Sequence, residues 1–195
     1  FSGRAFVISI GVDKYADSKF NLRFCQSDAD YFLKSLERDT TIKEILKYTI
    51  RNDGTKEQLK LAFSEVTKNA NKQDLFIFYY AGMSSGKSFK LTNEVLDYEE
   101  VFALSQNIFA ERQIYISDAS DGKQFGISFK QFLKEKPLEK ISTKIDRVLL
   151  SLNTVSFELQ KGANLKDSLF AGGQLTGGIS NSRMALTSIF NNLSN

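Results

Sequence analysis

Residues Phe76–Leu91 read FIFYYAGMSSGKSFKL, and this stretch decides the fold. The unbroken apolar and aromatic run Leu75–Tyr80 predicts a strand buried on both faces, as in a parallel sheet. Small and polar residues follow and predict a turn. In open α/β sheets, ligands and reacting groups lie beyond the carboxyl ends of the strands. The turn after Tyr80 is therefore a candidate site.

Outward from this stretch, strands alternate with helices. Further strands are predicted at Ala5–Val12, Ile45–Ile50, Gln113–Ser117 and Arg147–Leu152. Helices are predicted from Ser27, with Ser27 and Asp30 as a cap, from the capping box Thr55–Gln58, over Tyr98–Phe109, around Phe129–Leu133 and over Leu186–Leu193. This alternation has the spacing that βαβ crossovers need. It predicts an α/β sandwich with a mostly parallel central sheet.

The length and composition are those of one globular domain. The 195 residues, 42% of them hydrophobic and 25% charged, suffice for one sizeable core. We therefore predict a single domain over residues 1–195, with an irregular glycine-rich loop over 162–182. Because the first residue is Phe1, we expect a piece excised or processed from a longer chain.

The content of cysteine, histidine and charge narrows the function classes. Cys25 is the sole cysteine, which excludes an internal disulfide and favours a reducing, cytoplasmic location. The chain has no histidine, the commonest general base and metal ligand, so we expect neither a metal nor a cofactor. The net charge of +3 is scattered, and no apolar window has transmembrane length. We expect no nucleic-acid or membrane partner.

One alternative is a nucleotide-binding phosphate loop over Ala81–Ser88, which fits the loose pattern [AG]-x-x-x-x-G-K-[ST]. Lys87 and Ser88 are of the types that contact phosphate and Mg²⁺. However, the first position is alanine, and the segment after Ser88 lacks the helical periodicity that a phosphate site needs. The loop also follows the third strand, whereas nucleotide loops commonly follow the first.

Short motifs in this order resemble the caspase-type peptidases, especially metacaspases and bacterial caspase-like proteins. RAFVISIGVDKY (Arg4–Tyr15) resembles the opening strand of that family, and CQSDA (Cys25–Ala29) resembles its C-x-x-D-A helix start. FYYAGMS (Phe78–Ser84) and AERQIYISDASDG (Ala110–Gly122) resemble FYYAGHG and the D-A-C-H-S-G strand end. Phe89–Leu91 matches the short strand after the histidine loop. The resemblance implies a caspase-like three-layer α/β/α sandwich.

The same resemblance implies where the family's catalytic residues would stand. Met83 occupies the position of the histidine, and Ser120 occupies that of the nucleophilic cysteine. The family's second motif histidine is replaced by Asp121. Backbone N–H groups at Ser84 and Ser120 would face the oxyanion. The resemblance therefore indicates a member without its catalytic dyad.

The residue chemistry independently argues against hydrolysis. A serine hydroxyl needs a base within hydrogen-bond reach, and the Met83 thioether cannot accept a proton. Asp121, with an ordinary pKa of about 4, is a feeble base. Ser120-x-x-Lys123 mimics a serine–lysine signature, but Gly122 disfavours the helix that would align the two. An active hydrolase using Ser120 remains the alternative. Cys25, as a displaced nucleophile, lacks an activator, and we expect a half-buried thiol at a helix start.

Peptide binding is the function that this pattern favours. In metacaspases, the carboxylates at the positions of Asp28 and Asp118 line the pocket for an arginine or lysine side chain. The alternative is a structural role for both residues, Asp28 as a helix cap and Asp118 as an acceptor for loop N–H groups. The resemblance predicts a pseudo-peptidase that acts as a regulatory or scaffolding module. Its partners would be a basic peptide, other domains of the same chain or a homologous subunit.

Overall fold

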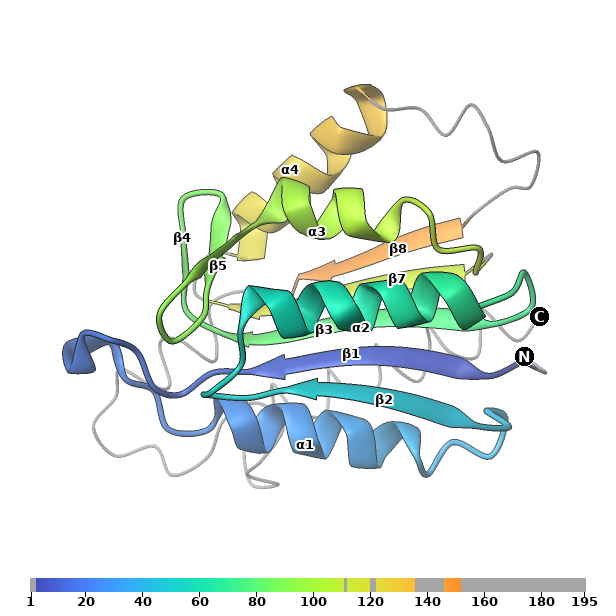
Figure 1. Cartoon of the computed structure of the whole chain (residues 1–195), viewed down its shortest axis with the longest axis horizontal. Coiled ribbons are helices and arrows are strands. Elements are labelled where there is room, and N and C mark those ends of the chain that lie inside the picture. The colour runs from blue at the N-terminus through green and yellow to red at the C-terminus, as the bar shows by residue number, and fades with distance from the viewer. Residues whose placement is uncertain (1–2, 111, 120–121, 136–145, 152–195) are drawn as a thin grey trace.

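The central sheet has parallel strands in the order β2-β1-β3-β7-β8 (Figure 1). The computed structural model describes residues 3–110, 112–119, 122–135 and 146–151. The strands are β1 (Ala5–Gly11), β2 (Ile45–Ile50), β3 (Leu75–Gly82), β7 (Arg112–Ala119) and β8 (Asp146–Ser151). The predicted parallel sheet is confirmed, and β3 extends two residues beyond the predicted end at Tyr80.

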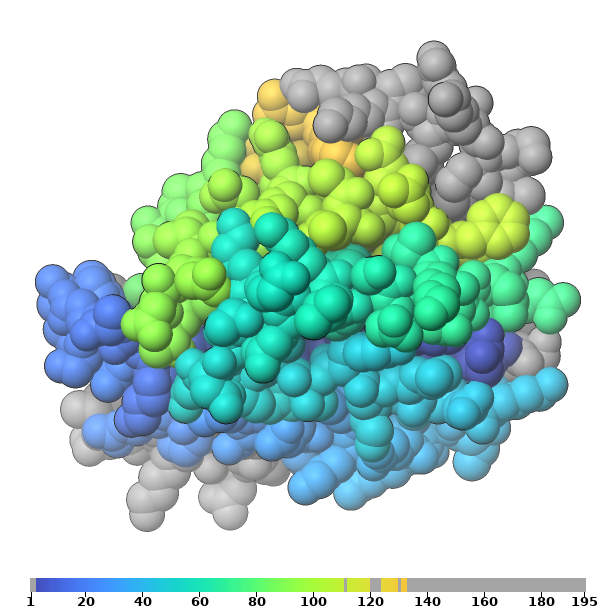
Figure 2. Space-filling model, viewed as in Figure 1, coloured from blue at the N-terminus to red at the C-terminus, as the bar shows by residue number. Residues whose placement is uncertain are grey.

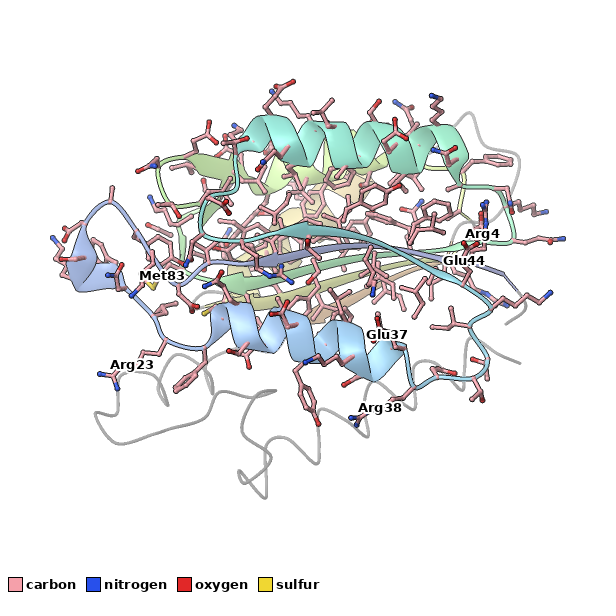
Figure 3. All side chains as sticks on the ribbon, turned by 60° about the horizontal axis from the view of Figure 1, so that its bottom comes forward. Arg4, Arg23, Glu37, Arg38, Glu44 and Met83 are labelled. Atoms are coloured by element: carbon pink, nitrogen blue, oxygen red, sulfur yellow. The ribbon has the colours of Figure 1, made fainter. Side chains whose placement is uncertain are left out.

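Helices cover both faces of this sheet. The helix α1 (Cys25–Leu36) packs on one face, and α2 (Lys56–Asn69), α3 (Tyr98–Ser105) and α4 (Gly122–Glu135) pack on the other. Figure 3 shows α1 and α2 on opposite sides of the sheet, and Figure 2 shows α2 and α3 closing over one face. Side chains of β3 alternate between two cores, with Tyr79 on the α1 side and Tyr80 on the other. The three-layer architecture is confirmed.

The two helices that follow β1 and β2 are capped differently. In α2, the predicted capping box is confirmed: the Gln58 backbone N–H donates to Thr55 Oγ1 at 3.2 Å, and the Thr55 N–H donates to Gln58 Oε1 at 3.0 Å. In α1, the predicted cap at Ser27 and Asp30 is wrong. The helix begins at Cys25, whose N–H donates to the Asp13 carboxylate at 2.7 Å. The cap comes from the loop after β1, where no local sequence pattern reveals it.

One helix end also differs from the prediction. The helix α3 ends at Ser105 and not at Phe109, because Ile108 and Ala110 turn their carbonyls toward the buried Gln113 side chain. The Gln113 amide donates to Ile108 O at 3.0 Å and to Ala110 O at 3.2 Å. The helix α4 begins at Gly122. Because Ser120 lies outside the described residues, the predicted lack of a helix that aligns Ser120 with Lys123 stays a prediction.

A small antiparallel sheet follows β3 and consists of β4 (Ser84–Ser85), β5 (Ser88–Lys90) and β6 (Val95–Asp97). Gly86 takes a φ of 63° in the two-residue turn between β4 and β5, a left-handed conformation that suits glycine. The short strand predicted over Phe89–Leu91 is present, one residue earlier. Because a strand follows Lys87, the segment Ala81–Ser88 lacks the helix N-terminus that a phosphate loop uses. The structure therefore argues against the nucleotide-binding alternative.

Some predicted features lie outside the described residues. These are the glycine-rich loop over 162–182, the helix over Leu186–Leu193, and the candidate residues Ser120 and Asp121. Within the described ranges, none of the helices combines the length and the apolar character needed to cross a membrane.

Candidate functional site

Three strands of the sheet end at one edge, where the candidate residues gather. Gly11 of β1 lies opposite Ala81 of β3, and Ala81 lies opposite Asp118 of β7. The loop after β1, Met83 after β3, and the strand end at Asp118 therefore share this edge. Ala119 ends β7 and Gly122 begins α4. Ser120 and Asp121, which stand between them in the sequence, lie outside the described residues.

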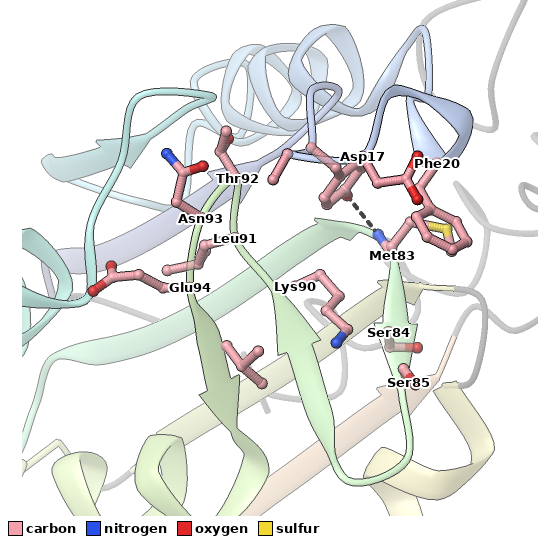
Figure 4. Close-up of a pocket in the computed structure, with 13 residues that line it drawn as sticks. Asp17, Phe20, Met83, Ser84, Ser85, Lys90, Leu91, Thr92, Asn93 and Glu94 are labelled. Carbon is pink, nitrogen blue, oxygen red and sulfur yellow. Dashed lines mark hydrogen bonds between the residues drawn. The ribbon is translucent and has the colours of Figure 1, made fainter.

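Two tyrosine hydroxyls fix the backbone at Met83. The Met83 N–H donates to Tyr15 Oη at 2.7 Å (Figure 4), and Tyr80 Oη lies 2.7 Å from the Met83 carbonyl oxygen and 2.6 Å from that of Lys90. The preceding Gly82 leaves room for both phenols. A Cβ at that position would lie 2.6 Å from Tyr80 Oη and 2.9 Å from Tyr15 Oη. The backbone of Met83 is therefore held tightly, while its side chain carries no group that titrates.

The two phenols do not replace a catalytic base. Burial raises the pKa of Tyr15 and raises that of Tyr80 well above its ordinary value, and the neighbouring Cys25 adds to both shifts. The Tyr15 hydroxyl donates a hydrogen bond to Val12 O at 2.9 Å. Both phenols are therefore protonated at neutral pH. Among the described groups that bind the Met83 backbone, none accepts a proton from a nucleophile at that pH.

Two carboxylates lie on the α1 side of the same edge. Asp28, in the first turn of α1, is 1% exposed, and Asp118, near the end of β7, is 3% exposed. The Tyr79 hydroxyl donates to Asp118 Oδ2 at 3.4 Å, and Asp28 lies close enough for its charge to affect the Tyr79 pKa. Burial raises the pKa of Tyr79 well above its usual value. The negative charges of Asp118 and Asp28 raise it further, by smaller amounts. The Tyr79 ring stacks on Phe32, with 4.4 Å between ring centroids.

This arrangement favours a positive charge. Carboxylates in a buried site interact with a cation through charge-assisted hydrogen bonds that water screens little. A guanidinium offers a planar set of donors that matches such carboxylates, and an ammonium offers three donors. The structure thus brings together Asp28 and Asp118, the two residues for which the sequence suggested a basic ligand.

Other candidate residues have clear structural surroundings. Cys25 is buried, 2% exposed, and not half-buried as expected; its N–H donates to Asp13 because it begins α1. Ser84 is buried in β4 opposite Phe89. The backbone that would face an oxyanion at Ser84 thus belongs to the small sheet.

Sequence reasoning missed the residues that shape this edge. Tyr15 and Tyr80 lay inside the quoted motifs but received no role. Asp13 and Asn52 fix the loop after β1, because Asn52 Oδ1 accepts the N–H of Asp13 at 2.7 Å and that of Lys14 at 3.0 Å. Their positions could have identified them, because Asp13 and Asn52 are polar residues that closely follow predicted strands, where α/β sheets place their sites.

The chain has a similar solved structure and matches the sequence model of one family. Among solved structures, protein GSU0716 from Geobacter sulfurreducens is similar, with 20% sequence identity and a TM-score of 0.49; the match covers 60% of this chain and 50% of that one. The chain thus spans about half the length of that structure. No curated protein gave a match. The sequence model of the caspase domain family, Peptidase C14, matches residues 3–192. Since this match covers nearly the whole sequence, the chain belongs to the caspase domain family, Peptidase C14.

Proposed function

We propose that this chain is a caspase-type domain that binds a peptide through an arginine or lysine side chain and does not cleave it. The observation that carries the proposal is the placement of Asp28 and Asp118 around Tyr79, at the edge where the parallel strands end. A module with this property would act as a regulatory or scaffolding partner. Its ligand would be a basic segment of another domain, of a homologous subunit or of a separate protein.

The absence of cleavage is supported by the chemistry at the end of β3. Met83 stands where the resemblance expects the proton acceptor, and the sequence contains no histidine. The two phenols at Met83 keep their protons at neutral pH because burial raises the pKa of each. Loss of the general base alone typically lowers the rate by about 10²- to 10⁴-fold. Ser120 would also be a weaker nucleophile than a thiolate.

Binding is tested with a fluorescein-labelled pentapeptide that carries a single central arginine, measured by fluorescence anisotropy. We expect saturable binding to the wild type, and a loss of at least about tenfold in affinity for Asp28→Asn and for Asp118→Asn, because each removes a charge-assisted contact. The matched control is Asp53→Asn, an exposed carboxylate in the loop after β2, which should bind normally. A peptide with norleucine in place of arginine should not bind. Melting curves of each variant show whether the protein remains folded.

Hydrolysis is tested with fluorogenic arginine and lysine peptides and a Ser120→Ala control. We expect no turnover by the wild type above the background of the Ser120→Ala variant. Turnover that disappears in Ser120→Ala would support the alternative, a divergent hydrolase that uses Ser120. Absence of arginine-peptide binding to a folded wild type would reject the proposed function.

A further inference from the structure

A pocket of about 420 Å³ opens beside Met83, between the loop after β1 and the small sheet (Figure 4). Asp17 and Phe20 of the loop form one wall, and Lys90 and Val95 of the small sheet form another. This volume falls within the range of small-molecule sites, about 300–1,000 Å³. The pocket is distinct from the two carboxylates, because Tyr79, Asp28 and Asp118 are absent from its lining.

Hydrogen bonds tie the walls of this pocket together. The Ala16 N–H donates to Thr92 O at 3.0 Å, and the Thr92 hydroxyl donates to Lys14 O at 2.8 Å. At the base, the Met83 N–H donates to Tyr15 Oη at 2.7 Å. The loop and the small sheet are thus joined at separate points. The pocket is therefore preformed, and preorganisation lowers the entropic cost of binding a ligand.

The surface of the pocket is largely apolar. Phe20 and Val95 keep 45% and 40% of their surface exposed, although both are large hydrophobic residues. Val95 lies directly opposite Lys90 in the antiparallel pair, so both project from the outward face of the small sheet, whereas the next pair, Phe89 and Leu96, is buried. An apolar group in the pocket would bury Phe20 and Val95 and would be favoured by the hydrophobic effect.

Of the charged residues that line the pocket, the two carboxylates have hydrogen-bond or ion-pair partners, and the lysine is available to a ligand. Asp17 forms an ion pair with Lys19 at 2.6 Å, and the Glu94 carboxylate accepts the Lys56 N–H at 2.7 Å in the first turn of α2. Lys90, in contrast, forms no ion pair within the part of the chain that the structure describes. Figure 4 shows the Lys90 side chain extending from β5 toward Ser84 of β4, and both residues line the pocket.

We propose that this pocket, called here the Lys90 pocket, binds an apolar carboxylate of the size of one or two amino-acid residues. The apolar body would pack on Phe20 and Val95, and the carboxylate would accept hydrogen bonds from the Lys90 ammonium. Two sources share this chemistry, a free organic acid and the carboxyl-terminal residue of a peptide. The site adds a second binding function to the domain and does not depend on Asp28 or Asp118.

The charge requirement is tested by isothermal titration calorimetry with 4-phenylbutyrate and its uncharged amide, 4-phenylbutyramide. We expect the acid to bind about five- to tenfold more tightly than the amide, as a partly exposed charge-assisted contact allows. In Lys90→Met, which keeps the apolar stem, this preference should disappear. The matched control is Lys87→Met, an exposed lysine on the same hairpin outside the pocket, which should retain the preference. Phe20→Ala should weaken acid and amide alike.

The source of the carboxylate is distinguished with two peptides, acetyl-Gly-Gly-Phe with a free carboxyl terminus and the same peptide as an amide. Binding of the free-terminus peptide at least as tight as that of 4-phenylbutyrate identifies a peptide end as the ligand. Much weaker binding of that peptide identifies a small organic acid. Both results support the Lys90 pocket, provided that Lys90→Met abolishes the preference for the acid.

Three results would overturn the proposal: no saturable binding of 4-phenylbutyrate up to millimolar concentration, equal binding of acid and amide, or a preference unchanged in folded Lys90→Met. Should Lys90→Met fail to fold, Lys90→Gln serves in its place, and Lys90→Arg should keep the preference. Asp28→Asn should bind 4-phenylbutyrate normally, and Lys90→Met should bind the arginine peptide normally. Failure of this proposal and failure of the proposed function are therefore distinguishable.

Discussion

Buried aspartates lie at both ends of the central sheet, but their surroundings differ. At the amino ends of β1 and β3, Asp74 is 2% exposed and is bound by Arg4: the Arg4 guanidinium donates to Asp74 Oδ2 at 2.9 Å, and the Arg4 N–H donates to Oδ1 at 3.1 Å. At the carboxyl ends, Asp118 and Asp28 lie around the phenol of Tyr79.

The two ends differ in what lies next to the aspartate. Arg4 and Asp74 form an ion pair that joins the starts of neighbouring strands. The carboxyl end has the same residue type next to loops and helix starts, where a parallel α/β sheet positions ligands. The Arg4–Asp74 pair is thus an internal example of the contact that we propose for a basic ligand at the opposite edge.

The largest expected effect is at the carboxyl end, in Gly82→Ala. A Cβ there would lie within 3 Å of both the Tyr80 and Tyr15 hydroxyls, so the phenols or the backbone must move. We expect the free energy of unfolding to fall by about 3 kcal/mol in urea titrations, the upper range for overpacking. Gly86→Ala is the control, because a Cβ there meets no atom within 4 Å. In that variant only the strain of the left-handed φ should lower the free energy of unfolding, by about 1 kcal/mol. Equal losses in the two variants would contradict this account of Gly82.

The next effect is at the amino end, in Asp74→Asn. Burial raises the pKa of Asp74, but hydrogen bonds from Arg4 and Asn71 outweigh it and leave the pKa below its ordinary value. The stabilisation is therefore complete above the unfolded pKa of about 4 and is lost as the pH falls through the lower folded pKa. We expect the variant to lose about 2 kcal/mol at pH 7 and to approach the wild type as the pH falls below about 4, in urea titrations across pH. A loss independent of pH would show that the Asp74 charge is not the cause.

A smaller effect separates the two faces of β3. Tyr80→Phe removes a hydroxyl that holds the carbonyls of Met83 and Lys90 at 2.7 and 2.6 Å, whereas Tyr79→Phe removes a longer contact of 3.4 Å to Asp118. We expect losses of about 1.5 kcal/mol for Tyr80→Phe and about 0.5 kcal/mol for Tyr79→Phe in the free energy of unfolding. The reverse order would show that the α1 side, and not the Met83 side, is the more tightly bonded.

The smallest effect is spectroscopic and concerns the phenols themselves. Because burial raises the pKa values of Tyr15, Tyr79 and Tyr80, the native state keeps these protons above pH 10, where an unfolded chain loses them. Stability should therefore fall as the pH rises past about 10. In absorbance titrations at the phenolate band, we expect these tyrosines to titrate only with unfolding. Tyr15→Phe should remove one phenol from that late step, and ionisation of all tyrosines near pH 10 in the folded state would contradict it.

Periodicity and local caps predicted most of the framework. The strands β1, β2 and β3 are uniform apolar or strand-like runs, and the capping box at Thr55 and Gln58 lies within a few residues, so short-range physics suffices to locate them. The start of α1 at Cys25 was missed because its cap, Asp13, lies twelve residues earlier and reaches the helix only after folding. The end of α3 was missed because the side chain of Gln113, on a separate strand, donates hydrogen bonds to the carbonyls of Ile108 and Ala110.

The sequence by itself determined the α/β class, the parallel sheet, the caspase resemblance and the lack of any histidine, since each depends on residue identity and spacing along the chain. Only the tertiary structure decided that the phenols of Tyr15 and Tyr80 bind the backbone at Met83, and that the Lys90 pocket forms between a loop and a hairpin far apart in sequence. The physical reason is that hydrogen-bond partners, burial and the pKa shifts that follow from them depend on long-range packing. That packing comes into existence only when β1, β3 and β7 end at a common edge.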